Sequence, residues 1–168
     1  GMKKGGVVDV IDSNLQSKVS EMRKSGLNIM MSMKDDAKPV SFIEDCAVQL
    51  KDLAEYTDGL NKIFNKYNVK GTWYAHASVG CLHVRPVLNM KIQDDVDKMR
   101  NIANETSSLV KKFKGSYSGE HGDGIARSEF NEVMFGKQMT NIFKSIKNSF
   151  DPLNIFNPGK IVDAPKLD

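Results

Sequence analysis

Cysteine and long apolar runs are both scarce in this 168-residue sequence. The two cysteines, Cys46 and Cys81, are too few for a disulfide framework, so a reducing compartment is the natural expectation. No apolar run approaches the roughly 20 residues that a membrane-spanning helix needs. Lys3-Lys4 precedes two glycines instead of the apolar core of a signal peptide. We therefore expect a cytoplasmic protein with no transmembrane segment.

The sequence also lacks an excess of charge of either sign. Its 24 Lys and Arg residues and 21 Asp and Glu residues give a net charge of +3, which is too balanced to indicate a nucleic-acid partner. The 13 glycines and 5 prolines exclude a collagen-like protein, and 40% hydrophobic with 27% charged residues excludes disorder as the main state. The length fits one domain, or one domain with a tail.

Hydrophobic periodicity divides the chain into strands and helices. Apolar runs bounded by glycine or polar turns predict strands, whereas apolar residues that repeat every three or four positions predict helices. The predicted strands are 27–33, 39–47, 72–77, 82–88 and 115–119, and the predicted helices are 14–24, 49–67, 94–113, 128–135 and 137–150. The polar segment 34–36 would join the first two strands as a hairpin.

The order of these elements predicts an α+β fold. Without the first strand it is β-α-β-β-α-β, the ferredoxin-like split βαβ order, in which helices cover one face of a mostly antiparallel sheet. We expect an N-terminal tag scar and lead-in segment at 1–26, a ferredoxin-like domain at 27–127 and a C-terminal helical segment of the same domain at 128–168. The other face of the sheet must be solvated or covered by something else.

The three histidines of the chain lie in two short segments. If Val79-Gly80 is a two-residue hairpin loop, His76 and His83 lie directly opposite each other on one face, with Cβ atoms about 4.5–5.5 Å apart. Two imidazoles at that separation can bind one metal ion. The alternative is that both are ordinary structural or surface residues of strands.

The second segment, 115–127, is rich in glycine and contains Glu120-His121. Its glycines indicate unusual backbone angles or a backbone that approaches a ligand closely, although a tight connection would also need them. Glu120 could complete a His-His-Glu metal site with an open coordination position. His121 is then a candidate general base, because imidazole titrates near neutral pH.

The remaining polar and sulfur-containing residues have simpler expected roles. We expect Glu44-Asp45 to lie on a solvated sheet edge and Asp123 to cap or brace the glycine turn. Cys46 and Cys81 are expected to be small buried thiols.

Four segments, in this order, resemble one known family. They are FIEDCAV, YAHASVGCLHV, SGEHGDGIARSEF and FDPLNIFNPGK. They resemble the C-terminal, substrate-side domain of FAD-linked oxidases, namely the D-lactate and D-2-hydroxyglutarate dehydrogenases and glycolate oxidases of the vanillyl-alcohol oxidase superfamily. The resemblance covers about residues 27–162, and YAHASVGCLHVRP most resembles large bacterial proteins that fuse the oxidase to an iron–sulfur module. The family's usual Gly-Asp-Gly-Asn centre between the two histidines is replaced here.

The resemblance implies a metal centre and a base. In the family, the histidine pair and the glutamate of the Glu-His-Gly motif hold a divalent metal, zinc or manganese, which assigns His76, His83 and Glu120 as ligands here. The next histidine, His121, is the implied base. The implied reaction is the metal-assisted oxidation of a D-2-hydroxy acid to a 2-oxo acid, with the proton going to the base and the hydride to the flavin.

The resemblance also assigns roles to three residues further along the chain. Arg127 would pair with a substrate carboxylate or brace the site, and its planar fork suits the carboxylate. Asn157 and Lys160 of the NPGK turn would lie toward the FAD-binding domain.

The sequence contains neither a glycine-rich dinucleotide fingerprint nor an iron–sulfur cysteine cluster. We therefore expect a fragment that is inactive alone, with FAD bound mainly by an absent domain and any iron–sulfur cluster in another. Its expected partners are that FAD-binding domain, a small 2-hydroxy acid, and copies of itself through the exposed flavin-facing surface. Two alternatives stay open: a stand-alone metal-binding or dimerisation module without redox activity, and a metal-dependent hydrolase that uses the same ligands to activate water.

Overall fold

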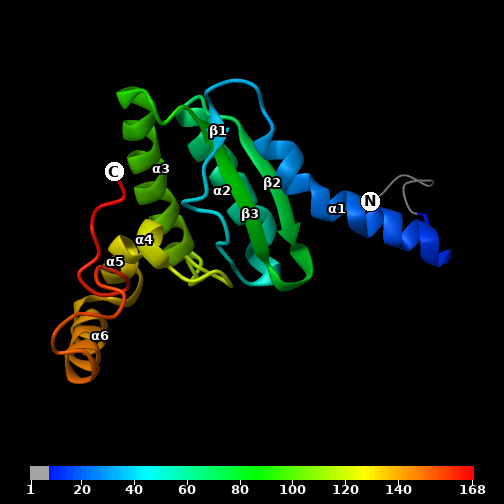
Figure 1. The fold of residues 1–168 in the computed structure, drawn as a ribbon. Coiled ribbons are helices and arrows are strands. Elements are labelled where there is room, and N and C mark those ends of the chain that lie inside the picture. Colours follow the sequence, from blue (N-terminus) through cyan, green and yellow to red (C-terminus); the bar gives the residue numbers. More distant parts are fainter. Residues whose placement is uncertain (1–7) are drawn as a thin grey trace. The chain divides into compact units, whose positions relative to one another are not determined.

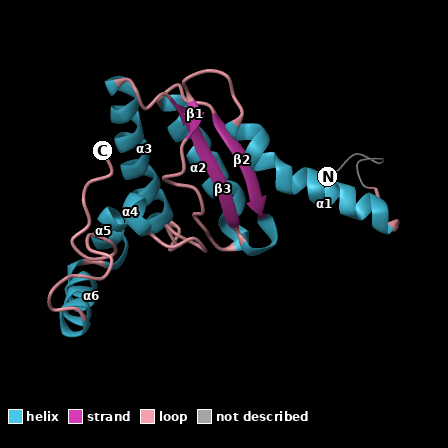
Figure 2. Ribbon diagram, viewed as in Figure 1, coloured by secondary structure: helices cyan, strands magenta, loops and turns pink. Residues whose placement is uncertain are grey.

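The structure, a computed structural model, describes residues 8–168 and divides into two units after Asp35. The residues expected to be a tag scar lie outside the described range. The helices are α1 (Ser13–Met31), α2 (Leu53–Lys66), α3 (Gln93–Lys112), α4 (Gly124–Arg127), α5 (Asn131–Phe135) and α6 (Lys137–Phe150), and the strands are β1 (Lys38–Pro39), β2 (Gly71–His76) and β3 (Cys81–Leu88) (Figures 1 and 2). Short 3-10 helices occupy Leu50–Asp52, Ala77–Val79 and Ser128–Phe130.

The described part of the first unit is built on α1. Asp12 caps this helix by accepting a hydrogen bond from the Leu15 amide at 2.8 Å. The predicted helix at 14–24 lies within α1, whereas the predicted strand at 27–33 and its hairpin with 39–47 are wrong. A short apolar run does not distinguish a strand from a helix. This run is rich in methionine, which favours helices, and has no proline to stop one.

The second unit contains an antiparallel sheet in the order β1-β3-β2. β2 and β3 form a hairpin, and residues 38–48 run along the other side of β3, where the Val84 amide donates to the Glu44 carbonyl at 3.1 Å. Within residues 38–48, regular strand geometry is confined to β1, so the predicted strand at 39–47 is mostly irregular. Its backbone groups nevertheless pair with β3.

A further backbone bridge extends this sheet by one segment. Ala47 bridges Cys81 on one side and Ser116 on the other, both antiparallel. The predicted final strand at 115–119 is therefore reduced to one bridge, but it lies where a fourth strand would. The order 115–119, 38–48, β3, β2 is the split βαβ order, and the α+β fold class is confirmed.

Helices α2 and α3 pack on the apolar face of this sheet, as predicted from the periodicity at 49–67 and 94–113. The two helices and β3 share one core, and Phe64 of α2 also contacts Trp73 of β2, with ring centroids 5.4 Å apart. The fully buried side chains of this core include Tyr56, Leu60, Ile102, Val110, Val84 and Leu88. Alternate side chains of β3 face the helices, which leaves His83 and Arg85 on the opposite face.

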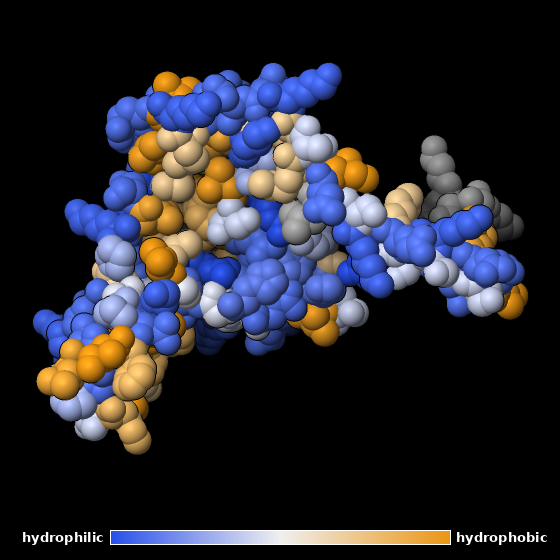
Figure 3. All heavy atoms as spheres, viewed as in Figure 1, coloured by the Kyte–Doolittle hydropathy of each residue, from blue (hydrophilic) through white to orange (hydrophobic). Residues whose placement is uncertain are grey.

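The C-terminal segment is helical in two pieces, as predicted at 128–135 and 137–150. Gly136, with φ 82°, separates α5 from α6. Apolar side chains of α6 and the following loop are exposed and gather on the surface (Figure 3); they include Ile142, Ile146, Phe150, Leu153, Ile155 and Phe156. None of the helices within residues 8–168 is long and apolar enough to span a membrane.

Candidate metal centre and general base

His76 and His83 meet on the polar face of the β2–β3 hairpin. His76 pairs with Cys81 and Tyr74 pairs with His83, so the loop has four residues, 77–80, and the predicted direct opposition of the two histidines is wrong. Residues 77–79 form a 3-10 turn, and Gly80 follows it with φ 72°. Val79 therefore lies in the 3-10 turn and not in a two-residue primed turn, for which a β-branched residue is poorly suited. The histidines are diagonal neighbours on one face, with ring centroids 4.9 Å apart.

Glu120 joins these two histidines from the glycine-rich segment. Its Oε1 lies 2.9 Å from Nε2 of His83 and 3.6 Å from Nε2 of His76. The Nε2 atom of His121 lies 3.3 Å from the same oxygen. The side chain of His83 is 2% exposed, whereas those of His76 and Glu120 are 41% and 42% exposed. His83 therefore forms the buried end of this trio, and His76 and Glu120 form its solvent-facing side.

The arrangement of His76, His83 and Glu120 fits a divalent metal ion. Nε2 of His83 is buried, forms no hydrogen bond, and faces a carboxylate oxygen, an arrangement that a cation between the two atoms would satisfy. In a tetrahedral site with ligand bonds of about 2.0–2.2 Å, neighbouring ligand atoms lie about 3.3–3.6 Å apart. The observed separations of 2.9 and 3.6 Å are close to that range.

Glu44 occupies the space behind the histidines, on the sheet side. Its Oε1 lies 3.1 Å from Nδ1 of His83, and its Oε2 lies 2.6 Å from Nδ1 of His121. Glu44, His83 and His121 form a second group that could hold a metal. However, Glu44 also forms an ion pair with Arg85, which already balances its charge, so the trio with Glu120 is the better candidate. The expected solvated edge at Glu44-Asp45 is wrong, because both residues are buried.

Asp45 holds the glycine-rich segment in place. Its Oδ2 accepts hydrogen bonds from the amides of Glu120 at 2.9 Å and His121 at 2.7 Å. Its carbonyl accepts from the Gly119 amide at 2.8 Å, and a Cβ at Gly119 would lie 2.8 Å from that carbonyl oxygen. Close backbone approach therefore explains this glycine, and the bonds fix the positions of Glu120 and His121.

Comparison with known proteins identifies the family of this chain. The family model described as "FAD linked oxidases, C-terminal domain" matches residues 1–161. The chain belongs to this family. The match confirms the resemblance found in the sequence.

Curated relatives of the FAD-linked oxidase domain are much longer than this chain. This chain is 34% identical over 144 residues to D-2-hydroxyglutarate dehydrogenase of Haemophilus influenzae, and the match covers 86% of this chain and 14% of that protein. It is 32% identical over 151 residues to D-2-hydroxyglutarate dehydrogenase of Escherichia coli, covering 90% and 15%. It is 28% identical over 162 residues to glycolate oxidase subunit GlcD of Bacillus subtilis, covering 95% and 34%.

Arg127 of this FAD-linked oxidase domain is held inside the protein. Its side chain is 8% exposed, forms an ion pair with Asp45, and donates a hydrogen bond to the Gly122 carbonyl at 2.6 Å. Burial lowers the pKa of the guanidinium from its ordinary value. Of the two roles expected for Arg127, these contacts favour bracing the loop over pairing with a substrate carboxylate.

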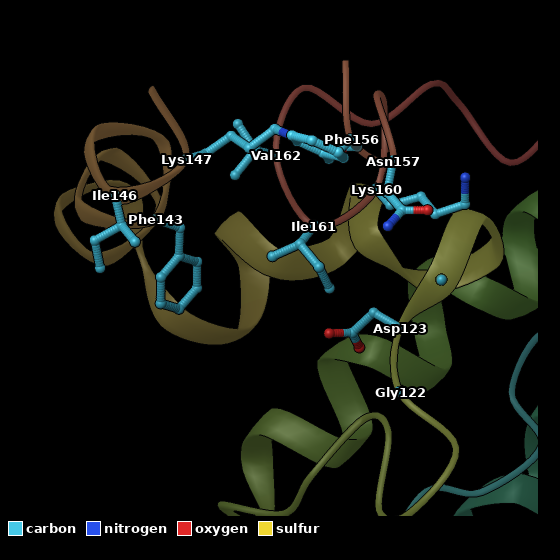
Figure 4. Close-up of a pocket in the computed structure, with 11 residues that line it drawn as sticks. Gly122, Asp123, Phe143, Ile146, Lys147, Phe156, Asn157, Lys160, Ile161 and Val162 are labelled. Carbon is cyan, nitrogen blue, oxygen red and sulfur yellow. The ribbon is translucent and has the colours of Figure 1, made fainter. Parts of the chain in front are cut away.

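Asn157 and Lys160 belong to the loop that follows α6. Both line a cavity of about 630 Å³, together with Asp123 and apolar side chains of α6 and the C-terminal loop (Figure 4). Gly122, the residue after His121, is one of the residues that line this cavity. Burial raises the pKa of Asp123. Asp123 stands at the N-cap position of α4, but its side chain makes no capping hydrogen bond, so the expected cap is wrong, and bracing of the glycine turn stays a prediction.

Four contributors to this site were not identified from the sequence: Glu44, Asp45, Tyr74 and Arg85. The Tyr74 ring stacks on His83 with centroids 4.5 Å apart, and its hydroxyl accepts a hydrogen bond from Arg85 at 3.1 Å. Alternation along the strands was an available signal, because Arg85 and Tyr74 both share the face of His83. Both cysteines are free and buried, as predicted, and burial raises the pKa of Cys46 to about 12.

Proposed function

We propose that this domain supplies the metal centre and the base of an FAD-dependent enzyme that oxidises a D-2-hydroxy acid to a 2-oxo acid. The observation that supports this most strongly is the convergence of His76, His83 and Glu120, with His121 on the same carboxylate oxygen. The names of the relatives, D-2-hydroxyglutarate dehydrogenase and glycolate oxidase subunit, support the substrate class.

In this proposal His76, His83 and Glu120 hold a divalent ion, zinc or manganese, that supplies Lewis acidity toward the hydroxyl and carboxylate oxygens of the substrate, while FAD in another domain accepts the hydride. His83 anchors the site from its buried position. His76 and Glu120 leave the outer side open to the hydroxy acid.

His121 is the proposed base. Its side chain is 45% exposed, and its Nε2 lies 3.3 Å from Glu120 Oε1, at the open side of the trio. From there it can take the hydroxyl proton of a substrate held beside the trio. Arg127 braces the loop that carries this base, and Asn157 and Lys160 lie toward the flavin domain. We propose that this chain is inactive without that FAD-binding domain, and that any iron–sulfur cluster belongs to a further domain.

Metal binding gives the first test of this proposal. Titration calorimetry of the 168-residue chain with Zn²⁺ and with Mn²⁺ should show one equivalent bound. His76→Ala and Glu120→Ala should each abolish that binding, whereas the exposed Glu132→Ala should not change it. Unchanged binding in both site variants would contradict the metal centre.

Activity gives the second test. A protein that contains this chain together with its FAD-binding domain should reduce a dye when given D-2-hydroxyglutarate or D-lactate. His121→Ala should lower kcat by about 10²–10⁴-fold, the usual contribution of a general base. A flavin-loaded protein that binds the metal but oxidises no D-2-hydroxy acid would contradict the proposed reaction.

A further inference from the structure

The single carboxylate of Glu44 contacts both His83, a candidate metal ligand, and His121, the candidate base. Oε1 faces Nδ1 of His83 at 3.1 Å, and Oε2 faces Nδ1 of His121 at 2.6 Å. The side chain is 5% exposed, and Arg85 completes its environment through an ion pair with Oε1. Neither relationship is visible in the sequence, because Glu44 precedes His83 by 39 residues and His121 by 77.

For neutral rings, the chemistry of these contacts has one consistent solution. A carboxylate that pairs with an arginine can only accept hydrogen bonds, whereas a neutral imidazole has one nitrogen that donates and one that accepts. Nδ1 must therefore be the donor in both His83 and His121. The lone pair of each ring then lies on Nε2, the atom that faces Glu120 at 2.9 and 3.3 Å.

We propose that Glu44 is a positioning residue that fixes His83 and His121 together in the Nδ1–H tautomer. One buried carboxylate would thus prepare the metal ligand and the base at once. The roles of His83 and His121 rest on the function proposed above. The tautomers themselves do not, because they follow from contacts within the domain.

The tautomers can be measured without metal, flavin or substrate. Long-range ¹H–¹⁵N spectra of the ¹⁵N-labelled 168-residue chain contain only three imidazoles, because the sequence has three histidines. We expect His83 and His121 to show a protonated Nδ1 and an unprotonated Nε2. Finding both rings as the Nε2–H tautomer, doubly protonated, or rapidly averaged would overturn the proposal whatever the activity of the enzyme.

Glu44→Gln provides the matched perturbation. Its amide keeps one acceptor and gains a donor, so one of the two rings must lose its Nδ1–H···O bond and change its ¹⁵N shifts, while His76 keeps its own. Zn²⁺ affinity should fall about 10–100-fold, as is usual when a partner behind a metal ligand is removed. Glu55→Gln, an exposed glutamate paired with Lys112, is the control and should change neither measurement.

Each outcome separates this proposal from the proposed function. Unchanged ring shifts in Glu44→Gln would overturn the positioning role even if the enzyme oxidises hydroxy acids. Fixed Nδ1–H tautomers that are lost in Glu44→Gln would support it even if no oxidation is found. If Glu44→Gln does not fold, the wild-type spectrum alone still decides between the two tautomers.

Discussion

Asp45 is the residue on which the Glu120-His121 loop depends most. It is fully buried, accepts hydrogen bonds from both loop amides, and pairs with Arg127. In Asp45→Asn the buried Arg127 loses its counterion, and removing one partner of a buried pair costs about 3–5 kcal/mol. We expect the free energy of unfolding to fall by that amount, measured by urea denaturation with Trp73 fluorescence.

An exposed ion pair provides the control for that prediction. Asp36 lies 2.7 Å from Lys91, but the two side chains are 62% and 73% exposed. Exposed pairs contribute about 0–1 kcal/mol, so Asp36→Asn should have a small effect. Equal losses in Asp45→Asn and Asp36→Asn would contradict the structural role of Asp45.

At the same scale, the histidines could be predicted from the sequence and the acids behind them could not. His76 and His83 converge although their predicted register is wrong, because the two-residue period of strands keeps diagonal neighbours on one face. The sequence predicts that Glu44 and Asp45 are a solvated pair, since charged residues are rarely buried without partners. Their partners lie far away in the chain, so no local pattern indicates their burial.

The element that sets the hairpin geometry is the loop at 77–80. Gly80 has φ 72°, and a Cβ there would lie 2.0 Å from the Val48 carbonyl oxygen. Gly80→Ala should therefore combine left-handed strain of about 1–2 kcal/mol with a backbone collision. We expect the free energy of unfolding to fall by more than about 2 kcal/mol, measured by urea denaturation.

A substitution at Gly122 would test backbone strain without the collision expected at Gly80. Its φ is 78°, but no atom lies within 4 Å of the position that a Cβ would take. Gly122→Ala should cost only the strain, about 1–2 kcal/mol. A Gly122→Ala loss as large as that of Gly80→Ala would show that contact with Val48 is not what requires glycine in the loop.

The end of α6 should open in acid. A hydrogen bond from Lys147 lowers the pKa of Asp151, and the amides of Ile155 and Phe156, each 2.9 Å from its carboxylate, lower it further. A carboxyl whose pKa is lower in the folded state stabilises the fold above its unfolded pKa of about 3.9 and loses that contribution as pH falls through the folded pKa. The protection factor of the Ile155 and Phe156 amides, the intrinsic exchange rate at each pH divided by the observed rate, should therefore fall below about pH 4.

Asp151→Asn is the control for this pH dependence. The side-chain amide keeps one accepting oxygen and does not titrate, so the protection factor of the backbone amide that it still binds should no longer fall in acid. The same acid dependence in the wild type and in Asp151→Asn would assign it to another group.

Elements with a clear period were predictable, and short ones were not. The amphipathic patterns of α2 and α3 identify both helices because their apolar faces pack on the sheet. The run at 27–33 has no such period, and its residues 27–31 are helical in continuity with the rest of α1. The segment 39–47 pairs with β3 only at intervals, which a propensity for extended structure does not reveal.

At the scale of the whole molecule, large apolar side chains are exposed around the end of α6. Phe150 is 85% exposed, Leu153 is 78% exposed, and Phe156 is 69% exposed, all close together in the sequence. Contiguous exposed apolar surface commonly marks an interface. The chain spans 14% to 34% of the length of the curated relatives described above.

This surface should make the isolated chain self-associate. Sedimentation velocity should show a mass that rises with concentration, because apolar surface left uncovered is buried between copies. Phe150→Glu should shift the chain toward monomer, whereas Ile11→Glu, at an 88% exposed residue in the other unit, should not. A chain that stays monomeric at every concentration would mean that this surface is tolerated in water and needs no covering domain. Equal shifts in the two variants would instead assign the association to net charge.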